Sequence, residues 1–346
     1  MYMTLKRFSF LLVTFGFAAG MLSMGGVVKA QDSAPGTSGS GLRVSPTRSE
    51  IVLKAGESKE VTQTVRNVTQ SPITVQPSLN DFESDGVTGQ PKLVGDPDEV
   101  SINSLREFVT LPGDFDLQPD EEKELTVAVL VPVNASPGAY FGSVLYRAAP
   151  VGGQNDGQVA LVASVGSLIL LEVPGDITEQ IEITDVSAYV DDSSGSLFTQ
   201  KPNKIGVTIS NLGNGFSRPF GKVSVSDWRG NNVFEYELNT VDRRSNVLPR
   251  STRLFSQEFM DVEEKSVNGQ VQQDKTSPVK WPGKYTITGN LSHGTTGEVF
   301  TVSSTFWYIP AWLIAILAVL LLVIIGSAHF MYRKHIKGGK PKRRRR

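Results

Sequence analysis

The stretch from Glu124 to Val131, ELTVAVLV, decides the fold class of this chain, because apolar and polar residues alternate along most of it. The same alternation recurs in KIGVTI at 204–209 and in YTITGNL at 285–291. A period of two is typical of strands with one buried and one wet face, and such strands form antiparallel sheets. No segment between residues 42 and 305 carries the 3.6-residue pattern of an amphipathic helix. The sequence therefore predicts an all-β body.

Two short patterns occur twice in the chain at nearly the same spacing. A strand-like run that ends at Asn67 recurs in a run that ends at Asn211, 144 residues later. The tetrapeptide Pro-Gly-Ala-Tyr ending at Tyr140 recurs as Pro-Gly-Lys-Tyr ending at Tyr285, 145 residues later. Two matches at one offset indicate two copies of one fold. We expect each asparagine to end a strand in a turn, and each tyrosine to pack across its sandwich with its hydroxyl on the backbone.

Short strands, turn signals about every ten residues and roughly 130 residues per copy are typical of immunoglobulin-like folds. The prediction is two tandem immunoglobulin-like antiparallel β-sandwiches, at 42–174 and 175–305, followed by a single transmembrane α-helix. The boundary between the sandwiches is expected at Pro174-Gly175-Asp176.

The N-terminus has the layout of a signal peptide. Lys6 and Arg7 precede an apolar run at 8–17, and Val28-Lys29-Ala30 places small residues where signal peptidase cleaves. Residues 1–30 are therefore a predicted signal peptide cleaved after Ala30, with an uncleaved anchor as the alternative. Residues 31–41, QDSAPGTSGSG, are a predicted flexible linker.

A second apolar segment predicts a membrane span at 306–332, so that the lipid bilayer is one partner. Residues 306–325 carry no charge, and Trp307, Tyr308 and Trp312 fall where aromatic rings favour the membrane interface. The tail at 333–346 holds nine basic residues and no acid, whereas 31–306 holds 22 lysines and arginines against all 35 acids. The positive-inside rule then predicts a single-pass type I membrane protein, with an extracellular ectodomain and a cytoplasmic tail.

The basic tail has two further interpretations. It can contact anionic lipid, or it can contact nucleic acid. A stop-transfer and topology signal explains it more simply, so no nucleic-acid partner is predicted.

The residues that catalysis commonly uses are scarce. The chain has no cysteine, which excludes thiol catalysis and cysteine-ligated metals. Of three histidines only His293 lies in the predicted ectodomain, in Leu-Ser-His-Gly at 291–294, which has the character of a hairpin tip. No metalloprotease, nucleophile-elbow or phosphate-loop motif occurs. We therefore predict no enzyme, no catalytic residue and no cofactor; a glycan hydrolase using paired carboxylates is the alternative.

Two groups of residues are candidate binding sites. Asp81, Glu83 and Asp85 alternate before Gly86, and oxygen ligands at this spacing suit a calcium loop. The twelfth position of the EF-hand calcium pattern is a lysine here, where the pattern has a glutamate. The alternative is a solvated loop. Three aromatic residues near turns are candidates for stacking on a sugar or anchoring a partner, with core packing as the alternative. They are Trp228, Phe216 and Phe220.

The opening strands resemble those of the WxL-interacting proteins of Gram-positive bacterial surfaces. The resemblance is in Leu-Arg-Val-Ser-Pro at 42–46, Leu-Lys-Ala-Gly-Glu-Ser at 53–58 and Val-Arg-Asn at 65–67, and in the order of signal peptide, two immunoglobulin-like domains, helix and basic tail. It implies peptidoglycan contact by the first domain and partner-protein contact by the second. The family's Asn/Gly-rich segment has a loose counterpart at 80–89. Periplasmic pilus chaperones are similar in the N-terminal strand but lack the helix.

These observations together predict a non-enzymatic, membrane-anchored bacterial cell-surface protein. Its immunoglobulin-like ectodomain is expected to bind cell-wall polymer (peptidoglycan) or surface proteins. The alternative function is an exported, chaperone-like assembly factor for surface appendages.

Overall fold

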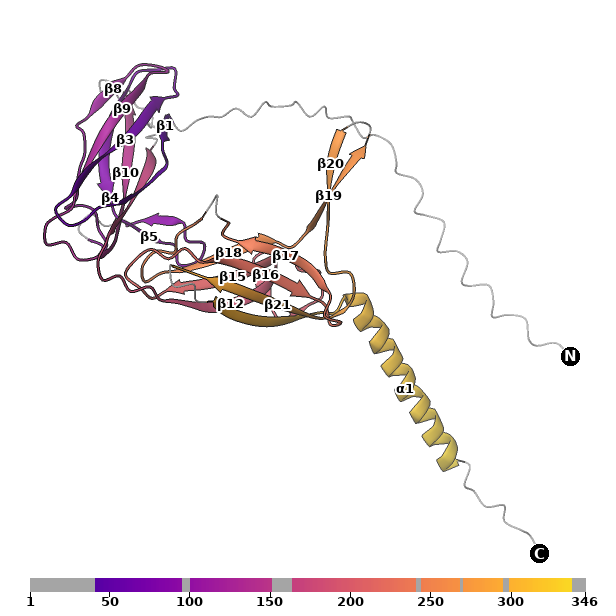
Figure 1. The fold of residues 1–346 in the computed structure, drawn as a ribbon. Coiled ribbons are helices and arrows are strands. Elements are labelled where there is room, and N and C mark those ends of the chain that lie inside the picture. The colour runs from indigo at the N-terminus through magenta and orange to yellow at the C-terminus, as the bar shows by residue number, and fades with distance from the viewer. Residues whose placement is uncertain are drawn as a thin grey trace, which may run out of the picture. The chain divides into compact units, whose positions relative to one another are not determined.

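The computed structural model describes residues 41–94, 100–150, 164–240, 244–267, 270–294 and 299–337. Four main sheets form two β-sandwiches, and one helix follows them (Figure 1). The predicted fold class is confirmed. The predicted signal peptide, nearly all of the linker, and the tail beyond Lys337 lie outside the described residues.

The first sandwich consists of a four-stranded and a five-stranded sheet. The four-stranded sheet has the order β1 (Leu42–Ser45), β3 (Ser58–Asn67), β9 (Glu122–Leu130), β7 (Val109–Thr110). The five-stranded sheet has the order β2 (Arg48–Val52), β11 (Ser164–Val173), β10 (Gly138–Pro150), β4 (Ile73–Asn80), β8 (Phe115–Leu117). A short hairpin of β5 (Phe82–Ser84) and β6 (Pro91–Leu93) forms a sheet of its own.

The second sandwich repeats this layout. One sheet has the order β13 (Ser193–Gly195), β12 (Ile181–Val190), β15 (Lys204–Asn211), β18 (Thr252–Glu258). The other has the order β14 (Leu197–Phe198), β22 (Val299–Tyr308), β21 (Gly283–Ser292), β16 (Phe220–Ser226), β17 (Asn232–Leu238). The strands β19 (Asp261–Val267) and β20 (Gln270–Thr276) pair only with each other.

Alternating side chains fill both cores, as the sequence period predicts. In β9, Leu125, Val127 and Val129 are buried while the residues between them are exposed. In β21, Tyr285 and Ile287 are likewise buried, while Thr286 between them is half-buried. Burying a valine or leucine side chain fully contributes about 1.5–3 kcal/mol, so these rows are the main source of each sandwich's stability.

The two repeated asparagines perform the same structural role in the two copies. The Asn67 side-chain amide donates to the Ser71 carbonyl at 2.9 Å, four residues on, and its Oδ1 accepts from the Thr69 N–H at 2.9 Å. Asn211 donates to the Gly215 carbonyl at 2.8 Å, and its Oδ1 accepts from the Gly213 N–H at 2.9 Å. Each amide also donates to a carbonyl of a distant loop, at Gln118 and Val247 respectively. Each asparagine thus fixes the turn after its strand, as expected.

The repeated tyrosines are also equivalent. The Tyr140 hydroxyl donates to the Ser136 carbonyl at 3.0 Å, and the Tyr285 hydroxyl donates to the Trp281 carbonyl at 2.7 Å. Each bond reaches back four residues across a Pro-Gly turn. The expected contact between hydroxyl and backbone is confirmed, and the duplication is visible in hydrogen bonds as well as in strand order.

A buried chain of hydrogen bonds links the two sheets of the first sandwich. The Tyr146 hydroxyl of β10 donates to Oε1 of Gln63 in β3 at 2.6 Å, and Nε2 of Gln63 donates to Ser167 Oγ in β11 at 3.0 Å. Ser167 in turn donates to the Pro46 carbonyl at 2.7 Å. Burial raises the pKa of the Tyr146 hydroxyl to about 12, so it keeps its proton and its bond to Gln63 at neutral pH.

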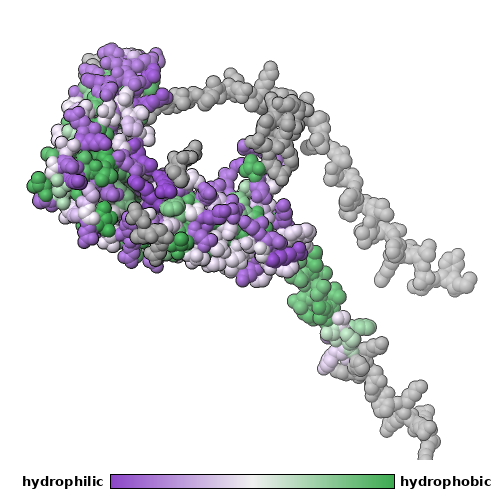
Figure 2. Space-filling view, viewed as in Figure 1, coloured by the Kyte–Doolittle hydropathy of each residue, from purple (hydrophilic) through white to green (hydrophobic). Residues whose placement is uncertain are grey.

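The helix α1 (Ala311–Lys337) follows the second sandwich after two residues. Its segment Ala311–Arg333 has 23 residues and a mean hydropathy of 2.8, long and apolar enough to cross a membrane. Figure 2 shows the part of this helix next to the second sandwich as a continuous hydrophobic surface.

The predicted start of the helix at Phe306 is wrong. Phe306 and Tyr308 are buried in the core of the second sandwich as the end of β22. The strand continues because alternation persists through Tyr308, and because Pro310 disfavours helical geometry at the residue before it. The helix begins only after Pro310, whose carbonyl accepts from the Leu313 N–H at 2.9 Å.

We predict that Asn211→Ala lowers the free energy of unfolding by about 3 kcal/mol, because it leaves buried backbone groups without partners. The exposed Asn232→Ala, which removes one bond to Glu235, is the matched control and is expected to change it by less than about 0.5 kcal/mol. Denaturant titration of the full-length protein in detergent measures both. Equal effects of the two substitutions would contradict the role assigned to Asn211.

Candidate functional site

The predicted calcium ligands do not converge in the structure. Asp81 is fully buried, and its carboxylate pairs with Arg106 at 3.2 Å and accepts from Ser104 Oγ at 2.7 Å. It also accepts from the Ser101 N–H at 3.2 Å. The oxygens of Asp81 therefore hold the loop that returns toward β10, and they are not directed at a metal.

The other two carboxylates of this loop point elsewhere. Glu83 is exposed in β5, opposite Lys92. Asp85 accepts from its own turn: from the Thr88 hydroxyl, from the Val87 N–H at 3.1 Å and from the Gly89 N–H at 2.7 Å. These bonds, the one from Thr88 first, hold the pKa of Asp85 below its usual value. Within the described ranges, no three histidine, cysteine or acidic side chains are grouped so that they could hold a metal ion.

The three predicted aromatic candidates lie in different surroundings. Phe216 is partly buried against Phe141 of the first sandwich, with ring centroids 6.3 Å apart, so it packs where the two sandwiches meet. Phe220 begins β16 under the guanidinium of Arg244, 4.4 Å from its ring centroid. Trp228 alone is strongly exposed, at 60%, in the turn between β16 and β17.

His293 directly follows β21, which pairs with β22 as a hairpin, as the sequence predicts, but its side chain is buried. It is 4% exposed, and its ring stacks on Phe300 at a centroid distance of 5.4 Å. This contact gives the imidazole a packing role.

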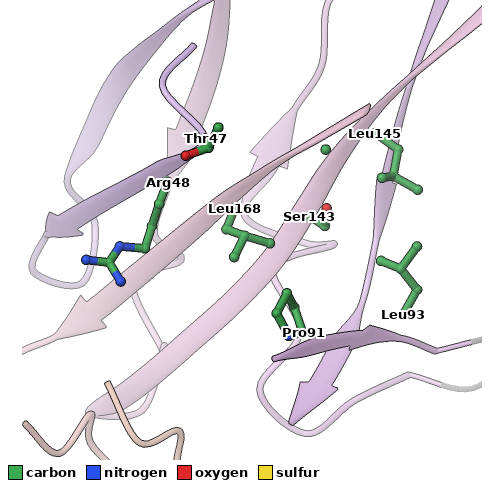
Figure 3. Close-up of a pocket in the computed structure, with 8 residues that line it drawn as sticks. Thr47, Arg48, Pro91, Leu93, Ser143, Leu145 and Leu168 are labelled. Atoms are coloured by element: carbon green, nitrogen blue, oxygen red, sulfur yellow. The ribbon is translucent and has the colours of Figure 1, made fainter. Parts of the chain in front are cut away.

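An open groove of about 510 Å³ lies on the outer face of the five-stranded sheet of the first sandwich, beside the β5–β6 hairpin (Figure 3). Aliphatic side chains and two hydroxyl groups make up most of its wall. Its only charged lining residue is Arg48, whose guanidinium is already paired with Glu50 at 3.2 Å. The lining residues are Thr47, Arg48, Pro91, Leu93, Ser143, Leu145, Gly166 and Leu168.

The last strand of the second sandwich has an open edge. In the first sandwich β2 pairs with five residues of β11, from Leu168 to Glu172. In the second sandwich β14 pairs only with Trp307 and Tyr308 of β22. Within the described residues, no strand pairs with this side of β22 between Val299 and Phe306.

The hydrogen bonds at the end of β22 show which backbone groups face this edge. The Trp307 N–H donates to the Ser196 carbonyl and the Ile309 N–H to the Phe198 carbonyl, both at 2.8 Å and both on the β14 side. Because alternate residues of a strand direct their N–H and C=O groups to the same side, those of Thr301, Ser303 and Thr305 also point to the open edge. Their exposed side chains are small and uncharged.

The open edge also lacks the usual protection against strand pairing. Sheet edges in proteins are commonly guarded by charges, prolines or very short strands. Other edge strands here carry charges, such as Arg43 in β1, Asp116 in β8 and Glu235 in β17. Residues 299–306, VFTVSSTF, contain neither a charge nor a proline. This stretch, which we call the β22 edge, is about 27 Å of unguarded backbone.

Sequence reasoning missed the β22 edge. Part of its signal is visible in the sequence, since VFTVSSTF is an uncharged run in an otherwise acidic body. The other part, the short reach of β14, depends on tertiary pairing and has no sequence signature.

Comparisons with known proteins assign the chain to no family. No family model matches the sequence, and no curated protein matches it as a relative. Solved structures with a similar course include the class 5 fimbriae chaperone CfaA, at 11% identity and a TM-score of 0.36, covering 78% of this chain and 99% of that chain. The Pseudomonas aeruginosa CupB2 chaperone has 14% identity and a TM-score of 0.32, with 74% and 97% coverage.

The E. coli chaperone DraB is similar at 13% identity and a TM-score of 0.31, covering 78% of this chain and 97% of that chain. Scores at this level are too low to carry an inference about what this chain does.

We predict that Asp81→Ala destabilises the protein by about 3 kcal/mol, because it removes the buried carboxylate that accepts from Ser101 and Ser104 and pairs with Arg106. Glu83→Ala, in the same loop but exposed, is expected to have an effect below about 0.5 kcal/mol. Thermal unfolding of full-length protein compares the two. If calcium raised the midpoint for wild type but for neither variant, the loop would be a metal site after all.

Proposed function

We propose that this chain is a non-enzymatic, membrane-anchored bacterial surface protein that holds extended segments of other surface proteins at the β22 edge. The observation that carries the proposal is the uncharged stretch from Val299 to Phe306, whose side away from β21 pairs with no strand among the described residues. A strand added there would satisfy the N–H and C=O groups of Thr301, Ser303 and Thr305, and main-chain bonds of this kind supply affinity in strand addition.

The side chains next to this edge define the segment it would accept. Phe300 and Val302 are only partly buried at the rim of the core. Every second side chain of an added strand would cover Phe300 and Val302. The remaining side chains of that strand would lie in water beside Thr301 and Ser303. The preferred partner segment is therefore extended, free of proline, and apolar at alternate positions.

Peptidoglycan is a weaker candidate partner. The resemblance to WxL-interacting proteins implies wall contact by the first sandwich, and the groove beside Arg48 is a hollow on that sandwich. The guanidinium there is already paired with Glu50, so the groove offers no free cation for a carboxylate of the polymer. Peptidoglycan binding stays an expectation from the resemblance alone.

The anchor in this proposal is α1, with the acidic sandwiches outside the cell and the basic tail inside. The charge separation supports this orientation, because the tail holds nine basic residues and no acid.

An exported assembly factor is the second candidate function. The β22 edge favours it in one respect: the strand leads directly into α1, so unfolded segments emerging at the membrane would reach it early. A scaffold would keep its partner at steady state, whereas an assembly factor would hold newly exported chains only. Pulse labelling followed by cross-linking separates the two.

We predict that Ser303→Pro weakens partner binding, whereas Ser303→Ala preserves it. Proline removes an N–H that faces the open edge and costs no bond to β21, so the sandwich tolerates it. The variant loses one backbone hydrogen bond to the partner strand, and the proline ring keeps that strand from approaching β22 closely. Together these losses should weaken binding by about tenfold or more. Since the chain has no cysteine, a photo-cross-linker attached to purified Thr305→Cys protein is confined to that position, and binding is then measured on cells to which the labelled protein is added.

Mass spectrometry of the cross-linked segment then identifies the partner. Equal cross-linking yields for the proline and alanine variants would show that the backbone of β22 is not the binding element. A linker on Ser193→Cys, at an exposed strand on the other sheet, controls for random collision.

A further inference from the structure

All four tryptophans of the chain are exposed, and all four belong to the end of the second sandwich from which α1 departs. Trp281 is 72% exposed, Trp228 60% and Trp307 48%; Trp312 lies in the first turns of α1. The first three come from three separate segments: the turn after β16, the loop before β21, and the end of β22.

The contacts around Gly283 bring these segments together. The Trp228 indole lies against Gly283, so close that a Cβ there would be 2.9 Å from the ring. Trp307 stands opposite Lys284 in the β21–β22 ladder. The backbone of Trp281 is held by the buried Tyr285, whose hydroxyl donates to its carbonyl at 2.7 Å. The three indoles are therefore displayed by a fixed framework at one end of the sandwich.

Basic side chains accompany the indoles. Arg229, Lys280 and Lys284 are exposed, and the Arg229 guanidinium lies 4.6 Å from the centroid of the Trp228 ring. The one acid in segments 227–231, 280–284 and 305–309 is Asp227. Its carboxylate accepts from the N–H groups of Arg229 and Asn231, each at 2.9 Å, and so is used within its own turn. The three segments that carry the indoles are thus basic on a sandwich region that is acidic overall.

The distance to α1 makes a bilayer the fitting occupant of this surface. Only three residues separate Trp307 from Ala311, which limits their separation to about 14 Å. The chain stays bonded to the sheet as far as Ile309. If α1 spans the hydrocarbon core, Trp307 and its neighbours lie within reach of the headgroup layer, where indole rings and basic side chains are both favoured.

We propose that Trp228, Trp281, Trp307, Arg229, Lys280 and Lys284 form a lipid-docking surface that seats the second sandwich on the headgroups of an anionic membrane. This inference rests on the proposed anchoring by α1 and adds a second contact to it. The indoles supply interfacial partitioning, and the three cations supply attraction to anionic headgroups.

The test uses full-length protein in vesicles of phosphatidylglycerol and phosphatidylcholine that contain brominated phosphatidylcholine. A variant with Trp228→Phe, Trp307→Phe and Trp312→Phe leaves Trp281 as its only tryptophan, which is excited selectively over the tyrosines. We expect bromolipid to quench this indole, its emission to shift to shorter wavelength, and iodide in the buffer to quench it poorly. Val133→Trp, in a chain otherwise without tryptophan, places an exposed indole in the first sandwich and is expected to show the opposite behaviour.

The charge contribution is tested in the same Trp281 reporter. Arg229→Gln, Lys280→Gln and Lys284→Gln should each reduce the ratio of docked to undocked sandwich by about fivefold, and only in vesicles that contain phosphatidylglycerol. Lys59→Gln, an exposed lysine in the first sandwich, is the matched control and should leave the ratio unchanged.

Flotation separates failure of the docking from failure of the anchor. If the protein floats with the vesicles while Trp281 is quenched by iodide and not by bromolipid, the docking surface is overturned and the anchor stands. The tryptophans would then be available to a protein partner instead. If the protein does not float, the proposed anchoring fails and the docking fails with it.

Discussion

The ladder between β21 and β22 is the interaction on which the functional features of this molecule depend. Its ten residue pairs run from Ser292 opposite Val299 to Gly283 opposite Tyr308. One side of β22 is consumed by this ladder, and Phe306 and Tyr308 are drawn into the core by it. The backbone groups on the other side of the strand remain available to another strand. The same register sets Trp307 opposite Lys284 and brings the chain to Pro310 with its backbone still bonded.

The two copies of the fold share the hydrogen bonds that fix their turns, and they differ in the strand that closes one sheet edge. Asn67 and Asn211 make the same bonds to the turns that follow them, and Tyr140 and Tyr285 make the same bond four residues back. The strand that closes the last edge differs in length, with five pairs in the first copy and two in the second. Because function is carried by sites and not by the fold, this divergence directs attention to β22.

Much of the fold could be predicted from the sequence, because its determinants are local. The alternation in 124–131, 204–209 and 285–291 needs only the period of the strand, and the paired Asn and Tyr positions need only a common offset. The start of the helix could not be placed, because apolar residues at 306–308 suit both a strand and a membrane span. Only the alternate burial of Phe306 and Tyr308 distinguishes the two.

The candidate site was less accessible to prediction, because sequence spacing does not say what a side chain faces. Asp81, Glu83 and Asp85 have the spacing of a calcium loop, yet Asp81 pairs with Arg106, Glu83 is exposed, and Asp85 accepts from its own turn. The exposure of Trp281 depends on the loop that Tyr285 holds, and the freedom of β22 depends on where β14 stops. Each of these is a property of pairing between distant segments, to which a single sequence gives no access.

Charge distribution connects the two functional surfaces. Residues 31–306 carry a net charge of −13, from 22 basic and 35 acidic residues, so an anionic membrane repels this part of the chain as a whole. Arg229, Lys280 and Lys284 form an exception at the end next to α1, and attraction there combined with repulsion elsewhere favours one orientation of the second sandwich. In that orientation the strand β22 leaves the membrane from Trp307 toward Val299, so its unguarded backbone is presented to the space outside the bilayer. Seating the sandwich on lipid would then improve partner capture by holding the β22 edge in a fixed direction, since a preoriented edge loses less rotational freedom when a strand joins it.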